Sequence, residues 1–230
     1  MREQIIGGKN CYLYDNGEAD FFLVQAVNAH ELEVLDKEIE IIKDLVPNVS
    51  FIYAAFLIRD WNKELAPWEA PAVFGKEGFG AGAADTLAFL TEELLPELRS
   101  AHGPGDSIDF YLGGYSLAGL FALWAAYQTE AFTGIAAVSP SVWFPGWDTY
   151  LSSHSLRTLQ VYLSLGDKEE KTRNKVMAKV GENIRKQDAI IEKENDKIAH
   201  VLEWNRGNHF AEPELRTAKG FAWLLNNRSI

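Results

Sequence analysis

Ser116 lies in a run of small residues, Gly113-Gly114-Tyr115-Ser116-Leu117-Ala118-Gly119. A β-like apolar run, residues 108–112, precedes it, and a helix-forming apolar run, residues 120–127, follows it. A serine on a sharp turn between a strand and a helix is exposed for attack, and the helix N-terminus offers free N–H groups to an anion. The pattern predicts that Ser116 is a nucleophile. The alternative is a glycine-rich turn without chemistry, and Ala118 departs from the G-x-S-x-G form.

A serine hydroxyl needs a general base in contact with it. Four of the five histidines lie at expected helix ends, in a polar connector or at the beginning of a strand: His30, His102, His154 and His200. His209 follows the expected carboxyl end of a strand and precedes a helix, with Gly207 close by. This position and its order after Ser116 favour His209 as the base. The alternative is a loop histidine without a role.

The third member of a serine triad is a carboxylate that holds the histidine in the productive tautomer. In the chain order serine, acid, histidine, the acid is expected after the strand at residues 159–165. Glu169, three residues after Gly166, is the favoured acid. Asp167 is the alternative, because it is nearer to the strand end but has a shorter side chain.

Two backbone N–H groups are expected to stabilise the oxyanion that forms when a serine attacks a carbonyl. Leu117 follows the serine and would supply one, and Trp61, in the loop after an apolar strand at residues 49–58, would supply the other. The predicted substrate pocket comprises Trp68, Tyr115, Ser141 and Trp143, with Trp61 and Trp147 as further walls. The alternative is that the loop tryptophans only cover the core.

Strand-forming and helix-forming segments alternate from residue 31 onward, which is typical of a mostly parallel sheet covered by helices on both faces. In such sheets ligands bind beyond the carboxyl ends of the strands, where the residues above gather. Near the N-terminus, runs 10–14 and 21–25 flank Asn16-Gly17, a strong turn signal, and are expected to form a hairpin at one edge of the sheet. A single domain over residues 1–230, without a separate lid domain, is predicted.

Composition and charge exclude several classes of protein. The net charge of −11 argues against a nucleic-acid partner, which would require a basic surface. One cysteine, Cys11, allows no internal disulfide, and no cluster has metal-ligand spacing, so neither a metal nor an organic cofactor is expected. The N-terminus lacks the apolar core of a signal peptide, and no apolar run approaches the ~20 residues that span a bilayer. The expected location is cytoplasmic, away from membranes, and the oligomeric state stays open.

Four stretches resemble the putative esterase family of α/β-hydrolases, which includes esterase D and the enterochelin esterases. They are Gly-Tyr-Ser-Leu-Ala-Gly-Leu at 114–120, Ser-Pro-Ser-Val-Trp-Phe at 139–144, Gly-Asp-Lys-Glu-Glu at 166–170 and Gly-Asn-His-Phe at 207–210. The resemblance implies an α/β-hydrolase fold, with Ser116 as nucleophile, His209 as base and Glu169 as acid. It does not fix the substrate, because the family's substrates range from small thioesters to large siderophores.

The predicted function is hydrolysis of a small-molecule carboxylic ester through an acyl-enzyme on Ser116. One alternative is an acyltransferase, in which an alcohol instead of water attacks the same acyl-enzyme. The other is a catalytically silent binding protein with the same fold, since a fold does not guarantee an activity. Without a lid, the site is expected to be open and to favour moderately sized esters over long-chain lipids.

Overall fold

A mixed sheet runs through the computed structural model, which describes residues 1–15, 17, 19, 21–102, 108–194 and 198–227. Within these residues the sheet has eight strands in the order β1-β2-β4-β3-β5-β6-β7-β8. The strands are β1 (Arg2–Ile6), β2 (Lys9–Tyr14), β3 (Phe21–Val27), β4 (Phe51–Leu57), β5 (Asp109–Tyr115), β6 (Gly134–Val138), β7 (Gln160–Gly166) and β8 (Ala199–Asn205). Strands β3 to β8 are parallel to their neighbours among themselves, so the predicted mostly parallel sheet is confirmed.

The N-terminal edge of the sheet differs from the prediction. β2 pairs antiparallel with β1 on one side and with β4 on the other, whereas β3 pairs with β4 and β5. The expected hairpin between runs 10–14 and 21–25 is therefore wrong, and Asn16 of its turn lies outside the described residues. The hairpin that forms joins β1 to β2 through Gly7 and Gly8, which both have positive φ. Every residue of β3 is buried, and such a strand is more stable inside the sheet, where neighbours cover it, than at the edge.

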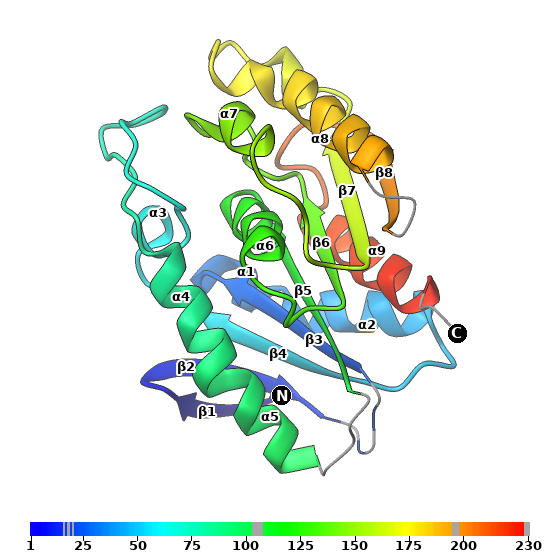
Figure 1. Ribbon diagram of the computed structural model, residues 1–230. Coiled ribbons are helices and arrows are strands. Elements are labelled where there is room, and N and C mark those ends of the chain that lie inside the picture. Colours follow the sequence, from blue (N-terminus) through cyan, green and yellow to red (C-terminus); the bar gives the residue numbers. More distant parts are fainter. Residues whose placement is uncertain (16, 18, 20, 103–107, 195–197, 228–230) are drawn as a thin grey trace.

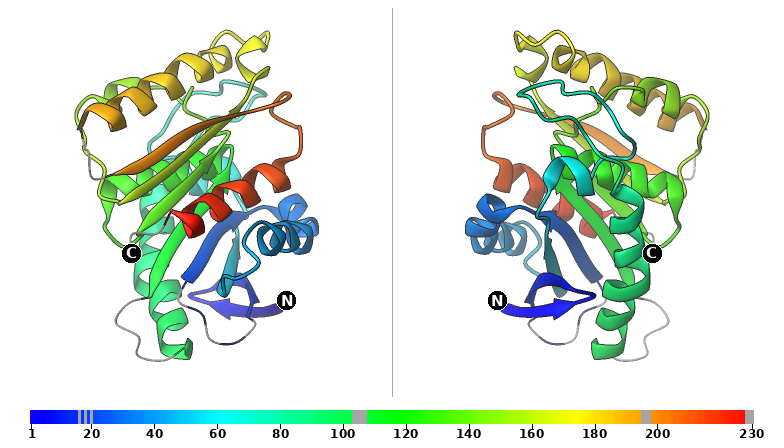
Figure 2. Two further views of the ribbon diagram at one scale, coloured as in Figure 1. Left: turned by 90° about the vertical axis from the view of Figure 1, so that its right-hand side faces the viewer. Right: turned by 90° about the vertical axis from the view of Figure 1, so that its left-hand side faces the viewer.

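Helices cover both faces of the sheet (Figures 1 and 2). On one face the apolar core includes residues of α4 (Ala83–Phe89), the π-helical turn η1 (Leu90–Leu94), α5 (Leu95–His102), α6 (Leu117–Gln128), α7 (Trp147–Leu151) and α8 (Val180–Glu194). On the other face it includes residues of α2 (Leu35–Leu45) and α9 (Pro213–Asn226). The sequence pattern at residues 31–45 predicts one helix, but the structure divides this region at Val34 into α1 (Ala29–Glu33) and α2.

The loops that follow the parallel strands contain short helices that the sequence pattern did not separate. α3 (Trp61–Glu64) lies after β4, and an isolated bridge joins Ala70 to Phe79 in the same loop. After β7 come two 3₁₀ turns, η2 (Glu169–Lys171) and η3 (Met177–Lys179). These loops lie at the carboxyl edge of the parallel strands, where the candidate site forms. Among the described helices, none combines the length and apolarity that crossing a bilayer requires.

Candidate active site

Ser116 forms the whole turn between β5 and α6. The strand continues to Tyr115 and the helix begins at Leu117, so the turn is tighter than the seven-residue run suggested. Ser116 has φ 58° and ψ −119°, a conformation that non-glycine residues rarely adopt. Its N–H donates to the carbonyl of Val138 at 3.0 Å, which ties the turn to β6. A strained residue between a strand and a helix is the backbone geometry that a nucleophile elbow requires.

The departure at Ala118 is accommodated by the glycines around it. A Cβ atom on Gly114 would lie 2.6–2.7 Å from atoms of Ala118, so the methyl group of Ala118 occupies space that Gly114 leaves open. A Cβ atom on Gly119 would lie 2.8 Å from the carbonyl oxygen of Gly114 and 3.0 Å from that of Val138. Close packing of helix against strand thus requires glycine at positions 114 and 119, and alanine fits at position 118.

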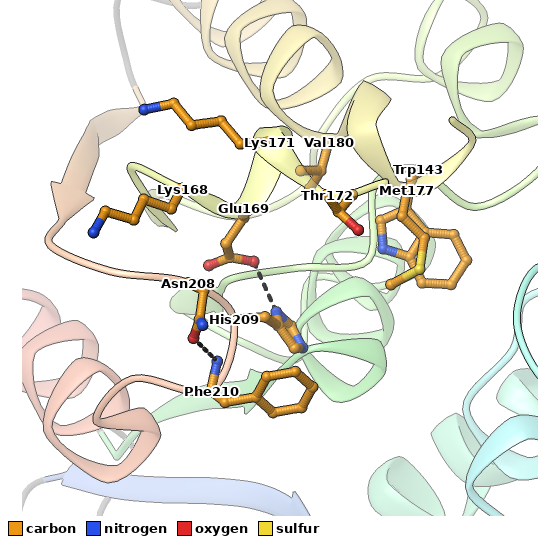
Figure 3. A pocket seen from close by; sticks show the side chains of 10 residues that line it. All are labelled: Trp143, Lys168, Glu169, Lys171, Thr172, Met177, Val180, Asn208, His209 and Phe210. Atoms are coloured by element: carbon orange, nitrogen blue, oxygen red, sulfur yellow. Dashed lines mark hydrogen bonds and ion pairs between the residues drawn. The ribbon is translucent and has the colours of Figure 1, made fainter. Parts of the chain in front are cut away.

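His209 lies in the loop between β8 and α9 and joins the serine to a carboxylate. Its Nε2 is 3.0 Å from Ser116 Oγ. Its Nδ1 is 2.7 Å from Glu169 Oε2, a contact that Figure 3 shows as a dashed line. An ionised carboxylate only accepts hydrogen bonds, so Nδ1 carries the proton and Nε2 is free to accept the serine proton. The three side chains therefore form one hydrogen-bonded chain with the polarity that a serine nucleophile requires.

Glu169 begins the 3₁₀ turn η2, which points its side chain into the protein. Its Oε1 accepts from the N–H of Gly166 at 2.8 Å, from the Ser139 hydroxyl at 2.7 Å and from Arg216 Nη1 at 3.1 Å. Burial would raise the pKa of Glu169, but the hydrogen bonds that it accepts, first of all from His209, outweigh burial and hold the pKa below its usual value. Glu169 is therefore the ionised partner of His209.

Asp167, the alternative acid, has a different contact. Its Oδ1 accepts from the N–H of Gly207 at 2.8 Å, and its own N–H donates to the carbonyl of Asn205 at 2.8 Å. These bonds join the loop after β7 to the loop after β8. Asp167 thus supports the backbone around the site, while Glu169 contacts His209.

The Ser139-Pro140-Ser141 stretch contacts both ends of the hydrogen-bonded chain. Ser139, with a positive φ of 43°, donates its hydroxyl to Glu169. Ser141 donates its N–H to the Ser116 carbonyl at 3.0 Å, and its Oγ lies 3.4 Å from Ser116 Oγ. The two serines thus contact Ser116 and Glu169 from the same loop, and the Ser141 hydroxyl lies beside that of Ser116.

A cavity of about 320 Å³ opens beside His209. Figure 3 shows Trp143, Met177 and Thr172 on one side and Phe210 next to His209, while the side chains of Lys168 and Lys171 extend away from it. The cavity is lined by Trp143, Lys168, Glu169, Lys171, Thr172, Met177, Val180, Asn208, His209 and Phe210. The walls around the space next to His209 are mainly apolar, as is common in pockets that hold small molecules.

A family model described as "Putative esterase" matches residues 55–210, more than half of the chain. The chain belongs to this family. No curated protein matches the sequence closely enough to align with it. Solved structures with the same fold include an IroE-like serine hydrolase from Shewanella oneidensis, with 14% identity and a TM-score of 0.78 over 96% of this chain and 77% of that one. The chain thus has the α/β-hydrolase fold, and no separate lid occurs among the described residues.

Two further neighbours are named as a siderophore hydrolase and as an enterobactin esterase. Siderophore hydrolase EstA from Aspergillus nidulans has 16% identity and a TM-score of 0.72, over 96% of this chain and 91% of that one. The enterobactin esterase FES from Shigella flexneri has 16% identity and a TM-score of 0.66, over 95% of this chain but 55% of that one. At these identities the likeness establishes the fold of this putative esterase family member.

The remaining pocket residues from the sequence lie in different places. Trp143 lines the cavity, but Trp68 donates Nε1–H to the carbonyl of Pro145 and stacks on Trp147, which is fully buried. Tyr115 lies on the other side of His209, with ring centroids 5.2 Å apart, and lines a second cavity of about 190 Å³. The aromatic residues of these loops therefore divide between core and cavity.

The two expected oxyanion donors begin helices. Leu117 is the first residue of α6, and Trp61 is the first residue of α3, in the loop that follows β4. N–H groups in the first turn of a helix have no acceptor within that helix, so neither of these N–H groups is used by the hydrogen bonds of its own helix. Within the described residues, no group of three or more histidine, cysteine, aspartate or glutamate side chains could hold a metal ion.

Arg216 is a residue of the site that the sequence reasoning missed. It lies on α9, is 2% exposed and contacts Glu169. Its spacing of four from Gly220 and again from Leu224, both buried, places it on the inward face of the helix. That spacing is a signal that could have found it.

Proposed function

We propose that this protein is a serine esterase that hydrolyses carboxylic esters of small molecules. The observation that carries the proposal is the chain from Glu169 Oε2 through His209 to Ser116 Oγ, with contacts of 2.7 and 3.0 Å. Membership of the putative esterase family supports the same chemistry.

In the proposed reaction, Ser116 Oγ attacks the ester carbonyl while His209 Nε2 takes its proton. Glu169 stabilises the imidazolium that forms, and the N–H groups of Leu117 and Trp61 stabilise the oxyanion. His209 then gives its proton to the leaving alcohol. A water molecule, activated by the same histidine, attacks the acyl-enzyme and restores the Ser116 hydroxyl.

The cavity beside His209 supports an uncharged, apolar group on one side of the ester. Its volume of about 320 Å³ and its Trp143, Met177 and Phe210 walls favour a group of moderate size. Esters within siderophores, after which one of the neighbours is named, are one class of small-molecule ester to which this proposal extends.

A fluorophosphonate probe tests the nucleophile. We expect the wild type to be labelled at Ser116 and to hydrolyse p-nitrophenyl acetate and butyrate, and Ser116→Ala to do neither. Ser141→Ala is the matched control, because it removes the hydroxyl 3.4 Å away and should leave the label on Ser116. Unlabelled wild type with the same background rate as Ser116→Ala would contradict the proposal.

Product analysis separates hydrolysis from acyl transfer. With a small alcohol added to the reaction, mass spectrometry should find the free acid as the main product. An ester of the added alcohol as the main product would instead identify an acyltransferase.

A further inference from the structure

Arg216 is a buried cation next to the proposed triad. A buried guanidinium must be paired and hydrogen-bonded, because leaving it unpaired costs a large desolvation free energy. Here the two terminal nitrogens have separate sets of partners. Nη1 lies 3.1 Å from Glu169 Oε1, 3.2 Å from Tyr115 Oη and 3.3 Å from Ser139 Oγ. Nη2 donates to the carbonyls of Arg206 and Asn208, each at 3.1 Å.

Arg216 is linked to the backbone on both sides of His209, directly through Nη2 and indirectly through Nη1 and Tyr115. The Asn208 carbonyl that Arg216 binds belongs to the peptide bond that leads into His209. The His209 carbonyl accepts from the Tyr115 hydroxyl at 2.6 Å, and Arg216 Nη1 donates to that same hydroxyl. Burial raises the pKa of Tyr115 to about 12, so this hydroxyl stays neutral and keeps its proton to donate.

The first set of contacts fixes which oxygen of Glu169 faces the histidine. Three donors, Arg216 among them, occupy Oε1 and leave Oε2 to His209. A Cβ atom on Gly166 would lie 3.0 Å from both Arg216 Nη1 and Glu169 Oε1, so a glycine leaves the space for this pair. One planar fork thus contacts the acid and the loop that carries the base.

We propose that Arg216 is a positioning residue that fixes the position of Glu169 relative to the loop that contains His209. The proposal rests on the triad function proposed above. Arginine suits the task because its fork donates in two directions in one plane, whereas lysine has a single charged nitrogen. The positive charge beside Glu169 also favours the ionised carboxylate.

Arg216→Met and Arg216→Lys test the proposal, with kcat, KM and the pH profile measured on p-nitrophenyl butyrate. A small displacement of a catalytic group can lower the rate by up to ~10²-fold, so we expect Arg216→Met to lower kcat by about 10- to 100-fold with little change in KM. The acid side of the kcat/KM profile reports a group that must be deprotonated for activity. Loss of the Arg216 positive charge favours the protonated form of a nearby group, so this side of the profile should move to higher pH. Arg216→Lys keeps the charge and should keep that pH midpoint while losing part of kcat.

Lys219→Met is the matched control. Lys219 is on the same helix and contacts Glu203 and Asn205 at the end of β8, away from the triad side chains. It should leave kcat and the pH midpoint near those of the wild type. Tyr115→Phe is a second variant for the case in which the Arg216 variants do not fold. It removes the hydroxyl that joins Arg216 to the His209 carbonyl and leaves Arg216 in contact with Glu169, so it should give a smaller fall in kcat.

The proton between His209 and Glu169 gives a readout that does not depend on turnover. In the wild type, a short hydrogen bond to an ionised carboxylate should give a ¹H NMR signal far downfield of the amides, and Arg216→Met should broaden or shift it. An unchanged signal together with an unchanged kcat and pH midpoint, in folded Arg216→Met or in Tyr115→Phe, would overturn the positioning role. Wild type that lacks turnover but shows the signal would instead contradict the esterase proposal alone.

Discussion

Glu38 carries the strongest expected dependence of stability on pH. It lies on α2, is 4% exposed, and its Oε1 is 2.7 Å from the Tyr53 hydroxyl. That hydroxyl also lies 2.6 Å from Gln25 Oε1. A tyrosine hydroxyl has one proton. With the Gln25 amide in this orientation, Tyr53 donates that proton to Gln25 Oε1, and its oxygen can accept a hydrogen bond from Glu38 when the Glu38 carboxyl is protonated. Burial, with the charges of Glu31 and Glu214 nearby, raises the pKa of Glu38 to about 8.

The raised pKa fixes the sign of the effect. Between the unfolded value of 4.5 and about 8, the folded protein holds a proton at Glu38 that the unfolded chain has released. The free energy of unfolding must therefore fall as pH rises through this window, and the loss is complete above pH 8. Because one pKa unit corresponds to about 1.36 kcal/mol, the loss is about 5 kcal/mol as an upper limit, since local rearrangement lets water reach the carboxylate.

Glu38→Gln removes this titration and keeps the side-chain shape. Urea unfolding at pH 5, 6, 7 and 8.5 should give a variant close to the wild type at pH 5 and more stable by several kcal/mol at pH 8.5. The other titrating groups are common to the two proteins, so the difference between the curves reports Glu38 together with its interaction with Glu31 and Glu214. Glu40→Gln, an exposed change on the same helix, should leave the pH dependence of the wild type in place. Parallel curves for Glu38→Gln and wild type would refute the reasoning.

Three further predictions concern the site. Glu169→Gln should lower kcat by ~10³–10⁴-fold, because it stabilises the wrong tautomer of the histidine, whereas Asp167→Asn should cost far less; steady-state kinetics on both compare the two acids. Gly114→Ala should destabilise the fold by about 3 kcal/mol or more in urea unfolding, because its Cβ would lie 2.6 Å from backbone, while Ala118→Gly should cost only about 1 kcal/mol. Met177→Trp should narrow the cavity and lower kcat/KM for p-nitrophenyl hexanoate more than for acetate, with Met177→Leu as control.

Local sequence patterns predicted the parts of the fold that depend on local interactions. The apolar run at residues 51–56 is buried along its length, as expected for a strand covered on both faces. The pairing at the N-terminal edge was not predictable in this way. The Asn16-Gly17 signal describes a turn, but which strands pair is decided by contacts between distant residues, and β3 is more stable between β4 and β5.

The acid shows why spacing alone left two residues open. Asp167 and Glu169 lie two residues apart in the same loop, and both are close to the strand end. The backbone separates them, because the bond from Asp167 N–H to Asn205 directs one side chain to Gly207, and the 3₁₀ turn directs the other to His209. The bonds from Asp167 to Asn205 and Gly207, and from His209 to Glu169, all join residues that are far apart in sequence.

Ala118 and Arg216 both show that the surrounding residues decide whether a residue fits its position. Ala118 departs from the motif, yet Gly114 and Gly119 leave the space that its methyl group needs, so the constraint belongs to three positions together. Arg216 follows no motif, yet its helical phase places it in the interior, where a charge is stable only if the surroundings supply several acceptors. A charged residue in the buried phase of a helix therefore marks a polar network, and in this chain that network surrounds the carboxylate that contacts His209.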